Sequence, residues 1–168
     1  MIVKAVAWAL KHNPILNSTY TDEKIILFSD INIGVATALE NGLIVPVIHQ
    51  ADKKTLSQIS AELINLTQKS RDSKLKPEDL SDGTFTISNL GMYGIDRFSA
   101  IINPPQSAIL AVGKMKRVFI ADEADQPVAR NIITFSLSAD HRVMDGSQAA
   151  MFLSDLQKSL QNLGEILK

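Results

Sequence analysis

The chain has 168 residues, a mass of 18.4 kDa and a formal net charge of -1, and 45% of its residues are hydrophobic against 21% charged. This length suits one domain of ordinary size, and the composition is that of a soluble globular protein rather than a disordered, collagen-like or membrane chain. The charge balance excludes binding of nucleic acid by bulk attraction, and the absence of cysteine excludes disulfides, cysteine-ligated zinc and a cysteine nucleophile.

The first part of the chain predicts a short helix followed by strands. Apolar residues at helical spacing predict a helix over residues 2–10, which ends before Pro14 because proline disfavours helix in the residue before it. Runs of β-branched residues then predict strands at residues 25–28, 31–37 and 43–48. A turn at residues 40–42 joins the last two strands, and Pro46 indicates a sheet edge or a bulge.

The rest of the chain predicts two amphipathic helices and four strands. Thr55 and Gln58 form a capping-box pattern, and the apolar residues after them predict a helix that ends near Ser70. A last helix is predicted over residues 147–163, and strands are predicted at residues 84–90, 107–112, 115–121 and 128–138. Because strands and helices do not alternate strictly, we expect an α/β (α+β) fold, a two-layer sandwich with a mixed sheet.

Membrane segments and secretory signals are not predicted. No apolar run approaches the roughly 18 to 20 residues that span a bilayer, and residues 1–10 lack the features of a signal peptide. We therefore expect a reducing, soluble compartment.

Three histidines are candidates for acid–base chemistry. His12 and His49 fall at predicted element ends, where a solvated imidazole is the simpler interpretation. His141 lies in a polar turn between a predicted strand and the last helix, where scaffolds often hold reactive side chains. An imidazole, with an ordinary pKa near 6.5, can be neutral at working pH and accept a proton from a thiol or hydroxyl. A purely structural turn is the alternative.

Asp145 follows His141 by four residues and has two structural interpretations. Its carboxylate can fix the turn, or it can cap the N-terminus of the last helix. A bond from Asp145 to the imidazole does not follow, because this spacing brings side chains together only inside a helix. A metal site is disfavoured, since His141 with Asp140 or Asp145 lacks the third ligand of a catalytic zinc site.

Two predicted strands carry hydroxyl groups along one face. Thr84, Thr86 and Ser88 alternate with apolar residues, and residues 132–138 alternate in the same way. Such a face is either the solvent side of a half-buried sheet or a wet channel whose hydroxyls point at a reacting carbonyl. Both interpretations stay open.

Signals for phosphate binding are weak. Gly91 and Gly94 do not have the spacing of a dinucleotide or Walker loop. Lys114, Lys116 and Arg117 are candidates for phosphate contact, although a solvated strand edge is the simpler interpretation.

Three ordered motifs are more specific. They read TFTISNLG from residue 84, NPPQSAIL from residue 103 and DHRVMDG from residue 140. With this spacing the chain resembles, over essentially its whole length, the catalytic core of the dihydrolipoamide acyltransferases, and it is most similar to their pyruvate dehydrogenase branch. The resemblance implies the fold of chloramphenicol acetyltransferase, whose His-x-x-x-Asp-Gly motif matches His141, Asp145 and Gly146.

The resemblance also implies residue roles. His141 matches the general base that takes the proton of a thiol, and Ser88 matches the serine that stabilises the tetrahedral oxyanion. Asp145 matches an aspartate that supports the active-site loop through an ion pair. The positions that match the surroundings of coenzyme A are Asn89, Gly113 and Lys114. No metal is implied.

Partners follow from the same resemblance. It implies a homotrimer, with His141 and Ser88 of each site on different subunits, and a larger cage of trimers. Coenzyme A is a substrate, the lipoyl group arrives on a separate domain, and the other dehydrogenase components are partners, whereas nucleic acid and membrane are not. The implied compartment is the bacterial cytoplasm or the mitochondrial matrix.

The chain departs from the family at its beginning. Family members continue upstream for several tens of residues, including an arginine that pairs with the aspartate at the position of Asp145. We therefore expect residues 1–168 to be the catalytic domain without that first segment, and without the lipoyl and subunit-binding domains.

Three functions stay open. The first is transfer of an acyl group, expected to be acetyl, between dihydrolipoamide and coenzyme A. The second is a non-catalytic scaffold or assembly fragment of the same fold, and the third is an acetyltransferase that acts on a hydroxyl acceptor.

Overall fold

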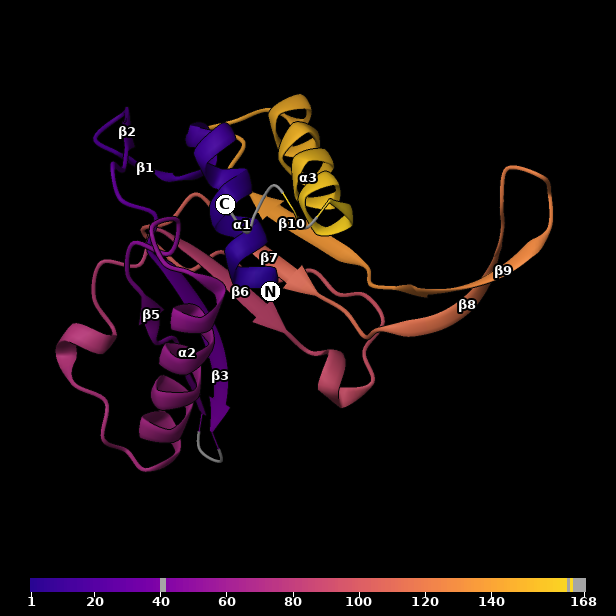
Figure 1. Ribbon diagram of the computed structural model, residues 1–168. Helices are drawn as coiled ribbons and strands as arrows, with labels where there is room; N and C mark the ends of the chain where they lie inside the picture. Colours follow the sequence, from indigo (N-terminus) through magenta and orange to yellow (C-terminus); the bar gives the residue numbers. More distant parts are fainter. Residues whose placement is uncertain (40–41, 163, 165–168) are drawn as a thin grey trace.

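A six-stranded sheet forms the centre of the computed structural model, which describes residues 1–39, 42–162 and 164 (Figure 1). The strand order is β10-β7-β6-β3-β4, and β5 also pairs with β3. The neighbours β3, β6 and β7 run parallel, whereas β4, β5 and β10 are antiparallel to their partners. The bounds are β3 (Ile33–Leu39), β4 (Gly42–Ile44), β5 (Val47–Ile48), β6 (Phe85–Asn89), β7 (Ala108–Val112) and β10 (Phe135–Ala139). The predicted mixed sheet is confirmed.

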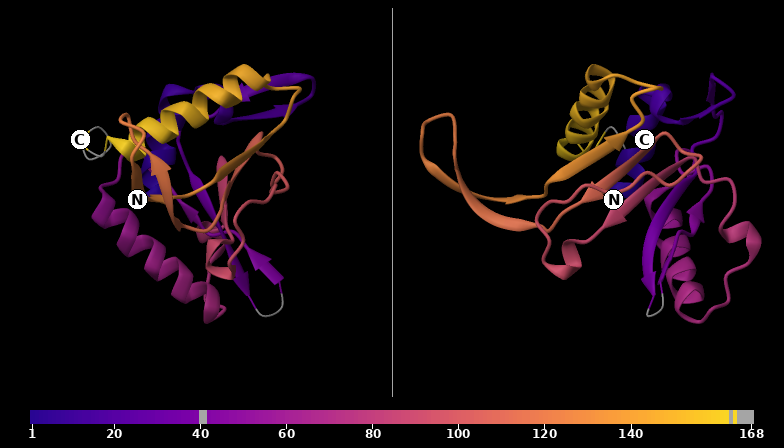
Figure 2. Two further views of the ribbon diagram at one scale, coloured as in Figure 1. Left: turned by 90° about the vertical axis from the view of Figure 1, so that its right-hand side faces the viewer. Right: turned by 180° about the vertical axis from the view of Figure 1, so that it is seen from behind.

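Three helices cover one face of this sheet (Figure 2). They are α1 (Ile2–His12), α2 (Leu56–Arg71) and α3 (Gly146–Gln161), and short 3₁₀ helices occupy Pro14–Leu16, Pro77–Asp79 and Gly91–Tyr93. Alternation along β6 turns Phe85 and Ile87 toward the helices, and the ring of Phe85 lies 5.6 Å from that of Phe152 on α3. The two-layer sandwich is therefore confirmed. Of the helices in the described ranges, none is both long and apolar enough to cross a membrane.

The sequence signals for helix ends are confirmed. The Gln58 N–H donates to Thr55 Oγ1 at 3.2 Å, and the Thr55 N–H donates to Gln58 Oε1 at 2.8 Å. This reciprocal pair satisfies two backbone donors that a helix start otherwise leaves without partners. Helix α1 ends at His12, immediately before Asn13 and Pro14.

Two predicted strands are each divided in the structure. In the predicted strand 43–48, residues 43–44 belong to β4 and residues 47–48 form β5. Between them the Pro46 carbonyl accepts from the Val35 N–H at 2.9 Å, but Pro46 has no N–H to donate to a ladder. Residues 128–138 form parts of β9 (Pro127–Ile132) and β10, which separate where the Thr134 carbonyl accepts from the Gly113 N–H. The predicted turn at residues 40–42 falls largely outside the described residues.

Two antiparallel hairpins accompany the main sheet. Strand β2 (Lys24–Leu27) was predicted, but its partner β1 (Ser18–Thr21) was not, because β1 is mostly polar. The second hairpin joins β8 (Lys116–Ala121) to β9 and projects away from the body of the molecule (Figure 1). Phe119 at its outer part is 78% exposed. A projecting hairpin with exposed large apolar side chains is typical of a protein interaction surface.

Candidate active site

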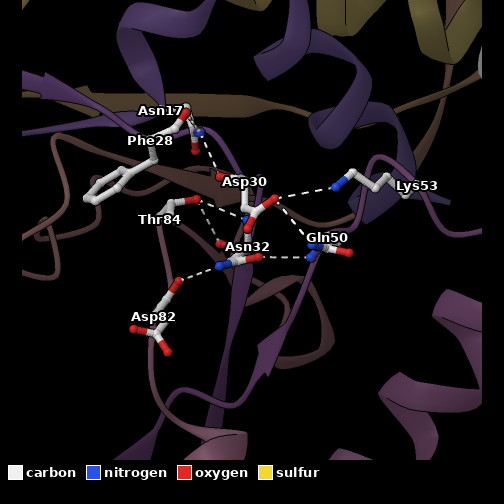
Figure 3. Close-up of polar contacts among 8 residues, drawn as sticks. All are labelled: Asn17, Phe28, Asp30, Asn32, Gln50, Lys53, Asp82 and Thr84. Carbon is white, nitrogen blue, oxygen red and sulfur yellow. Dashed lines mark hydrogen bonds and ion pairs between the residues drawn. The ribbon is translucent and has the colours of Figure 1, made fainter.

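The start of β6 is fixed by a hydrogen-bond network centred on Asn32 (Figure 3). The Asn32 N–H donates to Thr84 Oγ1 at 3.0 Å, and Asn32 Nδ2 donates to the Asp82 carbonyl at 2.8 Å. Asn32 Oδ1 accepts from the Gln50 N–H at 2.8 Å. Because Asn32 is buried and bonded through its backbone and through both polar atoms of its side-chain amide, the network sets where β6 begins and so where Ser88 lies along it.

The hydroxyl face of β6 is not a solvent face. Thr84 and Thr86 are buried, and Thr86 Oγ1 donates to Gln106 Oε1 at 2.6 Å. The solvent-face interpretation is therefore wrong for both threonines. Their hydroxyl groups bond Asn32 and Gln106, which lie on segments next to β6. Ser88 is half-buried, and its hydroxyl has no hydrogen-bond partner within the described part of the chain. Its O–H is thus available to a ligand.

The neighbours of Ser88 leave its hydroxyl accessible. In the parallel register Ser88 lies between Ala36 of β3 and Ala111 of β7. Residues paired in this way point to the same face of a sheet, and alanine is too small to cover the serine between them.

The predicted coenzyme A positions lie just beyond Ser88. Asn89 is paired with Val112 at the carboxyl ends of β6 and β7, and its Oδ1 accepts from the Gly91 N–H at 2.9 Å. Gly113 follows Val112 directly, and Lys114 has an exposed side chain and a backbone N–H bonded to the Ile95 carbonyl. One chain therefore brings Ser88, Asn89, Gly113 and Lys114 to the same end of the sheet.

Position 113 requires a glycine, because the neighbouring backbone leaves no room for a Cβ atom. A Cβ at this position would lie 2.0 Å from the Asp96 carbonyl oxygen, whereas a Cβ on Gly146 would meet nothing within 4 Å. We expect Gly113→Ala to lower the free energy of unfolding by about 1–3 kcal/mol through overpacking, and Gly146→Ala to leave it nearly unchanged. Urea denaturation of the two variants checks this, and equal midpoints would contradict the close approach.

His141 lies in the turn between β10 and α3. Its side chain is exposed, and its ring accepts or donates no hydrogen bond among the described residues. Asp145, at the end of the same turn, is the N-cap of α3, because its Oδ1 accepts from the N–H groups of Ser147 and Gln148 at 2.9 and 3.0 Å. These hydrogen bonds, the one from Gln148 first, hold the pKa of Asp145 below its ordinary value. The predicted helix cap is confirmed.

The ion pair implied for Asp145 is not formed in the described part of the chain, where no lysine or arginine makes a salt bridge with it. Within these residues Asp145 takes part in the capping box of α3, in which Gln148 Oε1 also accepts from the Asp145 N–H at 3.0 Å.

Ser88 and His141 lie toward opposite ends of the sheet in one chain. Ser88 is level with Ala111 of β7, but Ala139, the last residue of β10, is level with Ala108. Three residues of strand span about 10 Å, and His141 lies two residues further on. The arrowheads of β6 and β10 accordingly point in opposite directions (Figure 1). One chain thus separates the two residues that the resemblance assigns to a single site.

A cavity of about 740 Å³ opens beside the beginning of β6. Its lining includes Thr84, Gln106 and Val45 together with Asp30 and Asp82. Neither Ser88 nor His141 lines it, and no lysine or arginine does so within the described residues. The cavity therefore does not suit the phosphates of coenzyme A.

The remaining histidines contact backbone carbonyls. His12 Nδ1 lies 2.8 Å from the Trp8 carbonyl oxygen, with the two rings 4.0 Å apart, and His49 Nε2 lies 3.2 Å from the Ser81 carbonyl oxygen. Lys116 forms an ion pair with Asp96. No group of three or more histidine, aspartate or glutamate side chains that could hold a metal ion occurs in residues 1–39 and 42–162.

A family model described as 2-oxoacid dehydrogenases acyltransferase (catalytic domain) matches residues 1–168. The chain belongs to this acyltransferase family. Among relatives, the acetyltransferase component of the pyruvate dehydrogenase complex from Rickettsia bellii is 45% identical over 161 residues, 96% of this chain and 38% of the relative. The mitochondrial component 2 from Arabidopsis thaliana is 50% identical over 155 residues, 91% of this chain and 29% of the relative. The chain thus spans less than two fifths of either relative.

Solved structures of the family have the same fold. A dihydrolipoamide acetyltransferase from Azotobacter vinelandii, studied for the role of one serine, one histidine and one asparagine in its mechanism, is 36% identical with a TM-score of 0.94. The cubic core of a pyruvate dehydrogenase complex gives the same values, and this chain covers 69% of each of those chains while 99% of it is matched. A chloramphenicol acetyltransferase is 16% identical, with a TM-score of 0.58 over 99% of this chain and 76% of that one, which confirms the predicted fold.

Proposed function

We propose that the chain is the catalytic domain of a dihydrolipoamide acetyltransferase, which transfers an acetyl group between coenzyme A and dihydrolipoamide. The observation that carries the proposal is a pair of side chains, Ser88 and His141, that have no hydrogen-bond partner among the described residues, within a chain matched along its whole length by an acyltransferase family. The mechanism study of the Azotobacter enzyme supports this choice. The histidine and asparagine it names are four positions apart, as are His141 and Asp145 here.

The proposed chemistry needs one base and one oxyanion donor. His141 accepts the proton of the attacking thiol, and the sulfur forms a bond to the thioester carbonyl carbon. The carbonyl oxygen becomes an oxyanion, which accepts a hydrogen bond from Ser88 Oγ. The tetrahedral intermediate then breaks its bond to the other sulfur, which leaves as a thiolate and takes the proton from His141. A thiol with a pKa near 8.5 is mostly protonated at neutral pH, so the base is needed.

We propose that each site forms between two copies of the chain in a homotrimer, and that trimers build a larger cage. Support comes from the separation of Ser88 and His141 in one chain and from the projecting β8–β9 hairpin with its exposed Phe119. A residue pair that cannot meet within a chain can meet across an interface between copies. The solved cubic core of a similar protein also supports an assembly.

The proposed substrates approach opposite sides of that site. Coenzyme A lies near Asn89, Gly113 and Lys114, and the lipoyl group arrives on a separate domain of the dehydrogenase complex. The relatives are bacterial and mitochondrial proteins, which supports placement in the bacterial cytoplasm or the mitochondrial matrix.

The proposal is tested by incubating the chain with acetyl-coenzyme A and three acceptors: dihydrolipoamide, chloramphenicol and water alone. We expect acetyl-dihydrolipoamide and free coenzyme A in equal amounts, with no product on the hydroxyl acceptor. Sedimentation of the same sample reports the assembly. Trimers or larger particles without transfer would show a scaffold instead, and acetylated chloramphenicol would show the hydroxyl-acceptor enzyme.

A further inference from the structure

Asp140 and Arg142, the residues on either side of His141, form hydrogen bonds with each other. Arg142 Nε donates to Asp140 Oδ1 at 3.0 Å, and Arg142 Nη2 donates to Asp140 Oδ2 at 2.6 Å. The Arg142 N–H also donates to Asp140 Oδ1 at 3.0 Å, which closes the turn. A guanidinium fork on a carboxylate has a fixed geometry, so this pair limits the backbone of the residue between them.

The guanidinium of Arg142 also contacts a residue outside the turn, Tyr20. Its central carbon lies 4.6 Å from the centroid of the Tyr20 ring, a contact typical of a cation–π interaction. Tyr20 belongs to β1, which begins at the buried Ser18. Ser107 Oγ donates to the Ser18 carbonyl at 2.6 Å, and the Ser107 carbonyl accepts from the Asp140 N–H at 2.8 Å. Asp140 therefore contacts Ser107, Arg142 contacts Tyr20, and the hydrogen bond between Ser107 and Ser18 joins these two contacts through β1.

The hydrogen bonds between Asp140 and Arg142 bear on the orientation of the His141 imidazole, which no described side chain bonds. A general base needs a fixed orientation, which a hydrogen bond to its second ring nitrogen often gives. Among the described residues, none bonds the His141 ring, and the nearby Asp145 uses its Oδ1 to cap α3. The direction of the His141 side chain therefore depends on the backbone of the turn, which Asp140 and Arg142 define.

We propose that Arg142, held between the Asp140 carboxylate and the Tyr20 ring, is a positioning residue for His141. The inference rests on the proposed function, since it acts through the proposed base. Lysine cannot replace the arginine here, because an ammonium neither forms the planar fork nor stacks on a ring in the same way.

Steady-state kinetics of acetyl transfer by Arg142→Gln and Arg142→Lys tests the proposal. We expect kcat to fall by about tenfold or more in both variants, because small misplacements of a catalytic group are costly, while KM for each substrate changes less than about twofold. The melting temperature should stay close to the original, because Arg142 is exposed. Arg71→Gln, an exposed arginine at the end of α2, is the matched control.

Tyr20 provides a second, independent test. Tyr20→Leu removes the ring face and should lower kcat, whereas Tyr20→Phe keeps the ring and should restore it. If the two residues act through one contact, the double variant Tyr20→Leu with Arg142→Gln loses no more than Arg142→Gln alone.

Three results would overturn the inference. They are an unchanged kcat in Arg142→Gln, a lower kcat in Arg142→Gln accompanied by a clear fall in its melting temperature, and a double variant whose fall in kcat equals the product of the two single falls. An unchanged chain that fails to transfer acetyl groups would instead overturn the proposed function, and the inference would fall with it. Activity in the unchanged chain that is lost in His141→Ala but kept in Arg142→Gln overturns the inference alone.

Discussion

Replacing His141 with alanine is expected to lower the rate of acetyl transfer to dihydrolipoamide by about 10² to 10⁴-fold, the usual contribution of a general base. The effect should fall on kcat, because the imidazole takes the proton only as the thiol attacks. The assay follows release of coenzyme A from acetyl-coenzyme A at saturating dihydrolipoamide.

The control for this variant is stability. His141 is exposed and its ring bonds no described residue, so His141→Ala should unfold at the same urea concentration as the original chain. His12→Ala, at the end of α1, is the matched histidine variant and should retain full turnover. Unchanged turnover in His141→Ala would exclude the imidazole as the base and would favour the structural interpretation of the turn.

The sequence predicted the fold where its signals are local. Thr55 and Asp145 both act as helix caps, as expected from their positions, because capping involves backbone groups within one turn. The missed strand β1 lacks such a signal. It is mostly polar, and the carbonyl of its buried first residue, Ser18, accepts a hydrogen bond from Ser107, far along the chain. Long-range partners of this kind leave no periodic pattern.

The same distinction explains what was predicted of the site. Ser88, Asn89 and Gly113 share one end of the sheet because β6 and β7 are parallel, and all three positions were predicted from the family resemblance. The partners Gln106 and Tyr20 were not identified, since each contacts a site element only through the folded chain. The close packing at Gly91 was not predicted either, although a Cβ on it would lie 2.8 Å from the Gly113 carbonyl oxygen.

Replacing Ser88 with alanine is expected to lower kcat by about 10² to 10³-fold, the usual effect of losing one oxyanion donor. The hydroxyl bonds no described residue, so its removal should not change stability. Ser60→Ala, on the exposed side of α2, is the matched serine variant and should behave as the original chain. A change confined to KM would contradict the oxyanion role.

Mixing the two inactive variants tests where the halves of the site come from. Ser88 and His141 lie toward opposite ends of the sheet in one chain, so a site at an interface takes its serine from one copy and its histidine from the next. When His141→Ala and Ser88→Ala chains assemble together in equal amounts, about a quarter of the interfaces in a cyclic trimer combine the intact serine of one with the intact histidine of the other. We therefore expect co-expression of the two variants to restore about a quarter of the original turnover per site. A mixture as inactive as its components, with mixed trimers demonstrated by differently tagged chains, would show that each site lies within a single chain.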